Sequence, residues 1–305
     1  MAPFSVKVIR GAFGIAEHIV PRLTGRVAFE IFSRTANPNS PSAAERRVLQ
    51  QATRFMAGGR RHCLTARSGK VTAFEFRPPA GTLRMGTALV IHGWNSRTEH
   101  MKTVIEAFCE AGYKVVAIDL PGHGQSAGRR LNMALAVDAL RAAAEWLGPF
   151  SAVIGHSFGG AVAVNAAVGS VEGIAPLATD RLVLISAPSS MPAIFEDFGR
   201  FLNLGPRSQM AIAAQVKRIA GHPLESYVGA EQLRVMKIPT LVIHAPDDRE
   251  ISPDNAKAFA AAGSHVRLFW ARGLGHRRIL ADPVVAQEAV RFVAGVREPA
   301  LELAN

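Results

Sequence analysis

Ser157 stands in a sequence context that can turn a serine hydroxyl into a nucleophile. It lies in Gly155-His156-Ser157-Phe158-Gly159, directly after an apolar stretch that predicts a strand and directly before a small-residue helix. A sharp strand-to-helix turn of this kind lifts the hydroxyl above the sheet. There, the free N–H groups and the dipole of the helix favour developing negative charge. The pattern predicts acyl-transfer chemistry, with an idle serine at a glycine-rich helix start as the alternative.

Four further short motifs accompany this serine in order along the chain. They are His92-Gly93-Trp94, Asp119-Leu120-Pro121-Gly122-His123-Gly124-Gln125-Ser126, Asp247-Asp248 and Gly275-His276, and the serine motif stands between the second and the third. Together they resemble the α/β-hydrolase family over about residues 61–300, and the second motif is similar to its serine esterase and monoglyceride-lipase-like branch. The resemblance implies an α/β-hydrolase fold and acyl transfer to water through an acyl-serine intermediate.

A serine hydroxyl is a poor nucleophile unless a histidine accepts its proton and a carboxylate fixes the histidine tautomer. In the α/β-hydrolase order, the acid and then the histidine follow the serine. His276, in a glycine-flanked loop, is the expected base, whereas His265 opens an apolar strand and is expected to be structural. Residues 245–252 align Asp248 with the acid of the family, but two departures from the family pattern leave Asp247 as the alternative.

The oxyanion that forms during acyl transfer needs two hydrogen-bond donors. The backbone N–H of Phe158, the residue after the serine, is one candidate. The family resemblance implies the N–H of Trp94 as the second. His92 and His123 lie in motifs that invite a catalytic role, but we expect both to hold loops together by hydrogen bonds.

Strands and helices must position these residues. From about residue 61 onward, apolar runs that predict strands alternate with patterns that predict helices. Strands are expected at 62–67, 71–76, 87–92, 114–119, 150–155, 181–186, 239–244 and 265–270. Helices are expected near 98–111, 131–147, 158–169, 252–262 and 283–296. Continuous aliphatic strands alternating with helices indicate a mostly parallel, doubly wound α/β sheet that is covered on both faces.

Roughly fifty residues separate the sixth predicted strand from the seventh, too many for a single crossover connection. We therefore expect an inserted segment at about 188–236. Its apolar helical stretch includes the candidate substrate-binding residues Phe195, Phe198 and Phe201. One hypothesis is a lid whose inner face receives an acyl chain or another hydrophobic group. The alternative is that these residues only pack the insert against the main domain.

The basic charge of the chain is concentrated at its N-terminus. The 305 residues carry a formal net charge of +11, from 35 Lys+Arg and 24 Asp+Glu. Residues 1–70 hold 12 basic and 3 acidic side chains, a net charge of +9, so the rest of the chain is close to neutral. Because the catalytic portion is not basic and shows no nucleic-acid motif, no nucleic-acid partner is expected.

Residues 1–60 are predicted to form a helical extension that is separate from the chemistry of the hydrolase domain, residues 61–305. Apolar residues from Val6 to Ile31 recur at steps of three and four, as on one face of a helix. Pro21 is expected to divide this stretch into two helices.

Residues 1–35 are basic as well as amphipathic, and two alternative partners could cover their apolar face. A basic amphipathic helix can lie on an anionic membrane surface. The interpretation that we favour is packing against the hydrolase body or a second subunit, with the arginines facing solvent. The oligomeric state does not follow from the sequence.

The sequence gives no sign of a disulfide framework, a metal or cofactor site, a membrane-spanning helix or a leader. Cys63 and Cys109 are too few for a disulfide framework, and no metal-ligand spacing or Gly-x-Gly-x-x-Gly turn occurs, so no metal and no cofactor are expected. No apolar run reaches the ~18–20 residues of a membrane-spanning helix, and no leader is recognised. The expected location is cytoplasmic, with peripheral membrane contact if the extension binds lipid.

The nucleophile narrows the activities expected of this fold. A serine argues against the haloalkane dehalogenases and epoxide hydrolases of the family, which use an aspartate there. The expected function is hydrolysis of a small-molecule ester with a hydrophobic acyl group, as in a carboxylesterase or small lipase. Thioesterase, C–C hydrolase, perhydrolase and serine-peptidase activities are alternatives on the same residues. A non-catalytic binding protein on a hydrolase fold is the alternative of a different class.

Overall fold

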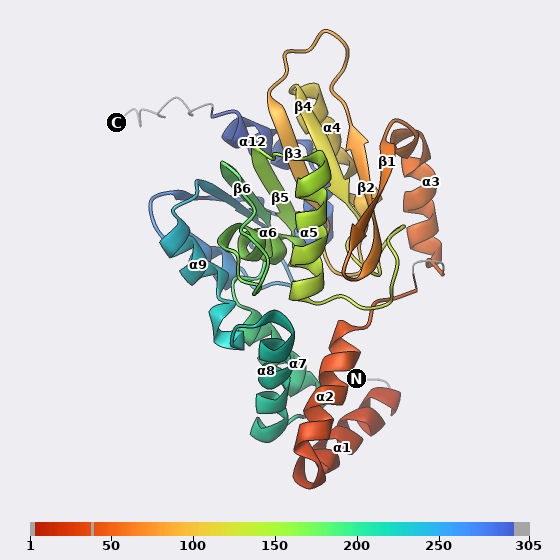
Figure 1. The fold of residues 1–305 in the computed structure, drawn as a ribbon, viewed down its shortest axis with the longest axis vertical. Coiled ribbons are helices and arrows are strands. Elements are labelled where there is room, and N and C mark those ends of the chain that lie inside the picture. The colour runs from red at the N-terminus through yellow and green to blue at the C-terminus, as the bar shows by residue number, and fades with distance from the viewer. Residues whose placement is uncertain (1–3, 38–39, 296–305) are drawn as a thin grey trace.

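An eight-stranded sheet forms the centre of the computed structural model, which describes residues 4–37 and 40–295 (Figure 1). Its strands follow the order β1-β2-β4-β3-β5-β6-β7-β8. Their bounds are Arg60–Ala66 (β1), Gly69–Phe76 (β2), Gly86–Ile91 (β3), Tyr113–Ile118 (β4), Ala152–His156 (β5), Arg181–Ile185 (β6), Thr240–His244 (β7) and Val266–Trp270 (β8). β2 pairs antiparallel with β1 and β4, and the other neighbours are parallel. The expected mostly parallel, doubly wound sheet is confirmed.

Helices cover both faces of the sheet, which is why its central strands are aliphatic along their whole length. They are α3 (Ala43–Ala57), α4 (Lys102–Glu110), α5 (Met133–Leu147), α6 (Phe158–Val168), α9 (Gly229–Met236), α10 (Asp254–Ala260), α11 (Gly275–Arg278) and α12 (Pro283–Val293), with short 3-10 turns at Thr98–Met101, Leu224–Ser226 and Ile279–Ala281. In β3, Leu89 and Ile91 join the apolar layer of α5 and α6. Ala88 and Val90, which alternate with them, join the layer of α4 and α12. The sheet therefore has one core on each side.

The carboxyl ends of the parallel strands meet at one edge of the sheet, where catalytic loops of such folds gather. Each of the five sequence motifs begins at or just after one of these ends. They are His92-Gly93-Trp94 after β3, Asp119 to Ser126 after β4, Gly155 to Gly159 at the end of β5, Asp247-Asp248 after β7 and Gly275-His276 after β8. Motifs that lie far apart in the sequence are thereby placed at one edge.

Four helices form a separate layer beside this body, at the bottom of Figure 1, and we call them the helical cap. They are α1 (Phe4–Ile19), α2 (Pro21–Ser33), α7 (Met191–Leu202) and α8 (Pro206–Ala220). α7 and α8 belong to the predicted insert, and α1 and α2 to the predicted extension. Pro21 begins α2, as predicted, whereas residues 1–3 of the extension lie outside the described residues.

The extension packs against the insert through small residues and buried polar groups. A β-carbon on Gly25 of α2 would lie only 2.3 Å from the carbonyl oxygen of Ser208, so glycine permits α2 to approach α8 closely. The buried Glu17 carboxylate accepts hydrogen bonds from the backbone N–H groups of Arg207 and Ser208, each at 3.1 Å. A carboxylate at the N-terminus of α8 satisfies free donors and complements the helix dipole. Specific contacts thus join α1 and α2 of the extension to α8 of the insert.

Candidate active site

Ser157 lies at the turn between β5 and α6, in a backbone conformation that L-residues rarely adopt. Its φ angle is 52° and its ψ angle is −125°. Such a conformation costs on the order of 1–3 kcal/mol and persists only where the surrounding structure holds it. Here the Ser157 N–H donates to the carbonyl oxygen of Ile185, at the end of β6, over 2.8 Å. The turn fixes the serine at the carboxyl edge of the sheet.

The glycines around Ser157 are required by close approaches of the backbone. A β-carbon on Gly155 would lie 2.4 Å from the carbonyl oxygen of Gly159, and one on Gly159 would lie 2.5 Å from that of His92. A β-carbon on Gly93 would lie 2.9 Å from Cβ of Ser157. All three distances are shorter than a van der Waals contact, so larger residues would push the turn and its neighbouring loop apart.

A hydrogen-bond network joins Ser157, His276 and Asp248, and we call it the Ser157 network. The Nε2 atom of His276 lies 3.1 Å from Oγ of Ser157. Its Nδ1 atom lies 2.8 Å from Oδ2 of Asp248. An ionised carboxylate only accepts hydrogen bonds, so Nδ1 carries the proton and Nε2 can accept the proton of the serine hydroxyl. The arrangement can therefore activate Ser157 as a nucleophile.

Asp248 is buried in surroundings that stabilise its ionised form. Burial by itself would raise the pKa of this carboxyl. The hydrogen bond from His276 and those from the backbone N–H groups of Ile251 and Glu250 outweigh burial and lower the pKa to about 2. A carboxylate that stays charged beside His276 stabilises the protonated ring.

Asp247, the neighbour of Asp248, makes a different contact. Its side chain is exposed, and its Oδ1 atom accepts the backbone N–H of Gly273 over 2.9 Å. This bond fixes the loop that leads into His276. Of the two candidate acids, the structure joins Asp248 to His276.

Two further side chains, those of His156 and Glu250, lie close to His276. The Nε2 atom of His156 donates to the main-chain carbonyl oxygen of His276 over 2.9 Å. Burial, and then the nearby His276, lower the pKa of His156 to about 3, so this ring stays neutral. The carboxylate of Glu250 lies 3.9 Å from Nε2 of His276 and pairs with Arg277 at 2.9 Å. In the ranges that the structure describes, no three His, Cys, Asp or Glu side chains gather as a metal-binding set.

The two predicted oxyanion donors flank the serine. Phe158 begins α6, and Trp94 lies in the loop after β3, one residue beyond Gly93. Neither backbone N–H has a hydrogen-bond acceptor in the described part of the chain. The two side chains pack edge to face, with ring centroids 5.1 Å apart. Both donors are therefore free to bind a negatively charged oxygen.

His92 and His123 hold the loops around these donors. The Nε2 atom of His92 accepts the backbone N–H of Leu120 over 2.9 Å. The Nε2 atom of His123 accepts the backbone N–H of Asn95, next to Trp94, over 3.0 Å. These bonds confirm the loop-holding contacts that we expected of both histidines.

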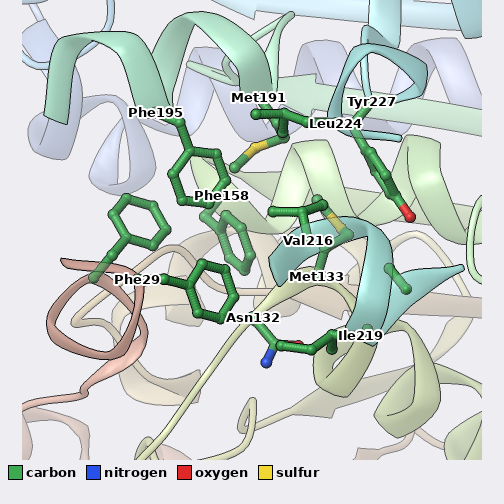
Figure 2. A pocket seen from close by; sticks show the side chains of 13 residues that line it. Phe29, Asn132, Met133, Phe158, Met191, Phe195, Val216, Ile219, Leu224 and Tyr227 are labelled. Carbon is green, nitrogen blue, oxygen red and sulfur yellow. The ribbon is translucent and has the colours of Figure 1, made fainter. Parts of the chain in front are cut away.

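An apolar cavity of about 30 Å³ lies beside Phe158, between the body and the cap. Its apolar lining includes Phe29, Phe32, Met133, Phe158, Met191, Phe195, Val216, Ile219, Leu224 and Tyr227. Figure 2 shows Phe29, Phe158 and Phe195 converging on it. Phe158 directly follows Ser157 in the chain, whereas Ser157, Asp248 and His276 themselves do not line the cavity.

The three phenylalanines predicted to bind substrate differ in position. Phe195 lines the cavity, and Phe198 packs against Phe32 with ring centroids 5.1 Å apart. Phe201 does not line the cavity, because it lies off the inner face of α7 and is 53% exposed. The next residue of α7, Leu202, is buried and belongs to the inner face of the helix.

The sequence analysis missed Phe29 and Phe32, which bring the N-terminal extension into the site. Phe29 lines the cavity, as does Phe32, whose ring centroid lies 4.5 Å from that of Phe195 and 5.4 Å from that of Trp94. We expected the extension to be separate from the chemistry, and the structure places two side chains of α2 at the cavity beside Phe158. The three-residue spacing of the two phenylalanines was a usable signal, because it places both on one helix face.

A sequence model of the Alpha/beta hydrolase family matches residues 88–290. The match begins within β3 and includes every strand from β4 to β8 and all five motifs. A curated relative, the dihydrolipoyllysine-residue acetyltransferase component of the acetoin cleaving system from Cupriavidus necator, is 37% identical over 95 residues. That alignment covers 30% of this chain and 25% of the relative, so the chain spans a quarter of its length.

Solved structures show similarity over most of the chain. A bacterial membrane phospholipase A has a TM-score of 0.60 and 20% identity, with 83% of this chain and 91% of that one covered. The carboxylesterase CesB from Bacillus subtilis has a TM-score of 0.59 and 17% identity, with 83% and 98% covered. At these identities the similarity establishes the fold.

Proposed function

Because the chain belongs to the alpha/beta hydrolase family, we propose that it is a serine hydrolase that cleaves carboxylic esters with an apolar acyl group. The observation that carries the proposal is the Ser157 network, in which His276 bridges Ser157 and Asp248. The apolar cavity beside Phe158 supports the preference for an apolar acyl group. The fold similarity to a carboxylesterase and a phospholipase agrees with this class of substrate.

In the proposed first step, Oγ of Ser157 attacks the ester carbonyl carbon while Nε2 of His276 takes the hydroxyl proton. The carbonyl oxygen becomes an oxyanion that accepts hydrogen bonds from the N–H groups of Phe158 and Trp94. Asp248 stabilises the protonated ring of His276. The tetrahedral intermediate then collapses, and His276 gives its proton to the departing alkoxide. The products are an alcohol and an acyl ester of Ser157.

In the second step, water replaces the alcohol. Nε2 of His276 takes a proton from the water as its oxygen attacks the acyl carbon, and the same donors bind the oxyanion. The intermediate expels Oγ of Ser157, which recovers the proton from His276. The carboxylic acid leaves, and the enzyme returns to its starting state with atoms and charge balanced.

The acyl chain is proposed to enter the cavity beside Phe158. The cavity is small, at about 30 Å³, so an acyl chain enters only if lining side chains rotate. Met133 and Met191 are suited to this, because unbranched thioether side chains adapt to irregular space.

Labelling with a fluorophosphonate tests the proposal, since only an activated serine reacts. Wild-type protein should be labelled at Ser157 and should hydrolyse p-nitrophenyl esters. A Ser157→Ala variant should lose labelling and several orders of magnitude in turnover. Ser189→Ala, at a serine outside the Ser157 network, is the matched control and should retain both. Full esterase activity in Ser157→Ala would refute the assignment, and matched thioesters and amides would show whether oxygen esters are preferred.

A further inference from the structure

α1 and α2 each expose several large apolar side chains. Of the fifteen large apolar side chains exposed in the described residues, eight lie between Val8 and Ile31, so exposure is concentrated in these two helices. Six of them form what we call the outer ridge, at helical spacing on each helix: Val8, Ile15, Ile19, Leu23, Val27 and Ile31. Each is between 43% and 72% exposed. A clustered apolar surface of this kind marks an interaction site more often than scattered exposed residues do.

The outer ridge is not the face by which the extension packs on the protein. α2 approaches α8 at Gly25, and its neighbours Thr24 and Ala28 are buried as well. Leu23 and Val27 fall on the opposite side of the helix and remain exposed. The apolar periodicity seen in the sequence thus belongs partly to the solvent side of α2. Folding of the cap therefore does not account for the ridge.

The charge around the ridge is positive. Lys7, Arg22 and Arg26 are exposed on the same two helices. The two carboxylates of these helices are already engaged, because Glu17 is buried against α8 and Glu30 pairs with Arg130 at 2.8 Å. An apolar ridge flanked by basic side chains complements a surface that has anionic groups outside and hydrocarbon beneath. No described helix is long and apolar enough to cross a bilayer.

We propose that the outer ridge and its basic neighbours dock this protein on an anionic lipid surface. The ridge side chains insert at the boundary between headgroups and acyl chains, while Lys7, Arg22 and Arg26 contact the headgroups. The opposite face of α2 carries Phe29 and Phe32, which line the cavity beside Phe158. Docking therefore places one wall of that cavity on the helix that contacts lipid. The docking itself does not depend on the proposed hydrolase activity.

Sedimentation with vesicles tests this proposal. Full-length protein should bind vesicles of phosphatidylglycerol and phosphatidylcholine, and should bind phosphatidylcholine alone at least tenfold more weakly. The combined variant Leu23→Gln/Val27→Gln/Ile31→Gln should lose at least tenfold in affinity, because each lost apolar insertion weakens binding. Arg22→Gln/Arg26→Gln should lose about 25-fold at low salt, at roughly fivefold for each basic side chain near an anionic surface.

Matched controls lie elsewhere on the surface. Leu83→Gln/Val235→Gln removes exposed apolar side chains outside the cap, and Arg47→Gln/Arg54→Gln removes basic ones from α3. Both should bind vesicles as wild type does, and so should Ser157→Ala, which separates docking from catalysis. Wild type that ignores anionic vesicles, or ridge variants that bind unchanged, would overturn the proposal. So would a ridge variant that only dissociates a dimer in analytical ultracentrifugation, since a second copy would then cover the ridge.

Discussion

Asp247 and Asp248 are adjacent residues with the same side chain, and their surroundings separate them. Asp248 is buried, accepts two backbone N–H groups and contacts His276. Asp247 is exposed and holds the loop at Gly273. Asp248 contacts His276, whereas Asp247 only holds the loop. The same substitution should therefore have different consequences at the two positions.

We predict that Asp248→Asn lowers kcat by roughly 10⁴-fold, because an amide stabilises neither the required tautomer nor the protonated form of His276. Asp247→Asn keeps an oxygen that can accept the Gly273 N–H and should change kcat less than tenfold. Steady-state kinetics on a p-nitrophenyl ester measures both. A larger loss in Asp247→Asn than in Asp248→Asn would show that the acid has been assigned to the wrong neighbour.

At the scale of elements, α2 links the two halves of the molecule. Phe32 packs against Phe195 and Phe198 of α7 and against Trp94 in the loop after β3. α7 contributes Phe195 to the cavity, whereas its Phe201 faces solvent. The wall of the cavity is thus shared between the extension and the insert, and changes in α2 should affect the choice of acyl group.

We predict that Phe32→Ala lowers kcat/KM for an octanoate ester about tenfold more than for an acetate ester. The reason is that only the longer chain reaches the apolar contact that is lost, which is worth on the order of 1–2 kcal/mol. Phe201→Ala, the control on α7, should leave the ratio of the two rates within twofold. Equal losses on both esters would mean that Phe32 acts through the Trp94 loop or through folding, and not on the acyl chain.

At the scale of the whole molecule, buried ionisable groups couple stability to pH in opposite directions. Burial lowers the pKa of five histidines, which are His92, His100, His123, His156 and His244. The folded protein therefore binds fewer protons at these sites than the unfolded chain, so acid favours unfolding. Burial raises the pKa of Asp119 to about 6, which has the reverse effect. Single variants are needed to separate the contributions.

We predict that His156→Gln makes stability less sensitive to acid. The pKa of His156 falls from 6.5 to about 3 on folding, so its contribution is complete above pH 6.5 and is lost as pH falls toward 3. Between pH 7 and pH 5 this loss amounts to about 2 kcal/mol, which the variant should not show. Urea unfolding at the two pH values measures it, with the exposed His222→Gln as control. An unchanged difference between the two pH values would contradict the prediction.

The strands and the Ser157 network could be predicted because they depend on local signals. Aliphatic runs mark buried parallel strands, and the order of the motifs brings Ser157, Asp248 and His276 to one edge. Hydrogen bonds join the three side chains, while their catalytic roles stay a prediction. The contribution of α2 could not be predicted, because it depends on the distant contact of Gly25 with α8, and periodicity does not identify which partner covers a helix face.

Because α2 has a functional surface proposed on each of its two faces, binding at one face can be coupled to binding at the other. One face lines the cavity and the other carries half of the outer ridge, so ligands on the two sides would contact the same helix. Reciprocity then applies: if lipid on the ridge favours a wider cavity, an acyl chain in the cavity must strengthen lipid binding by the same factor. If both proposals hold, lipid binding would then be stronger while the cavity is occupied and weaker once it empties.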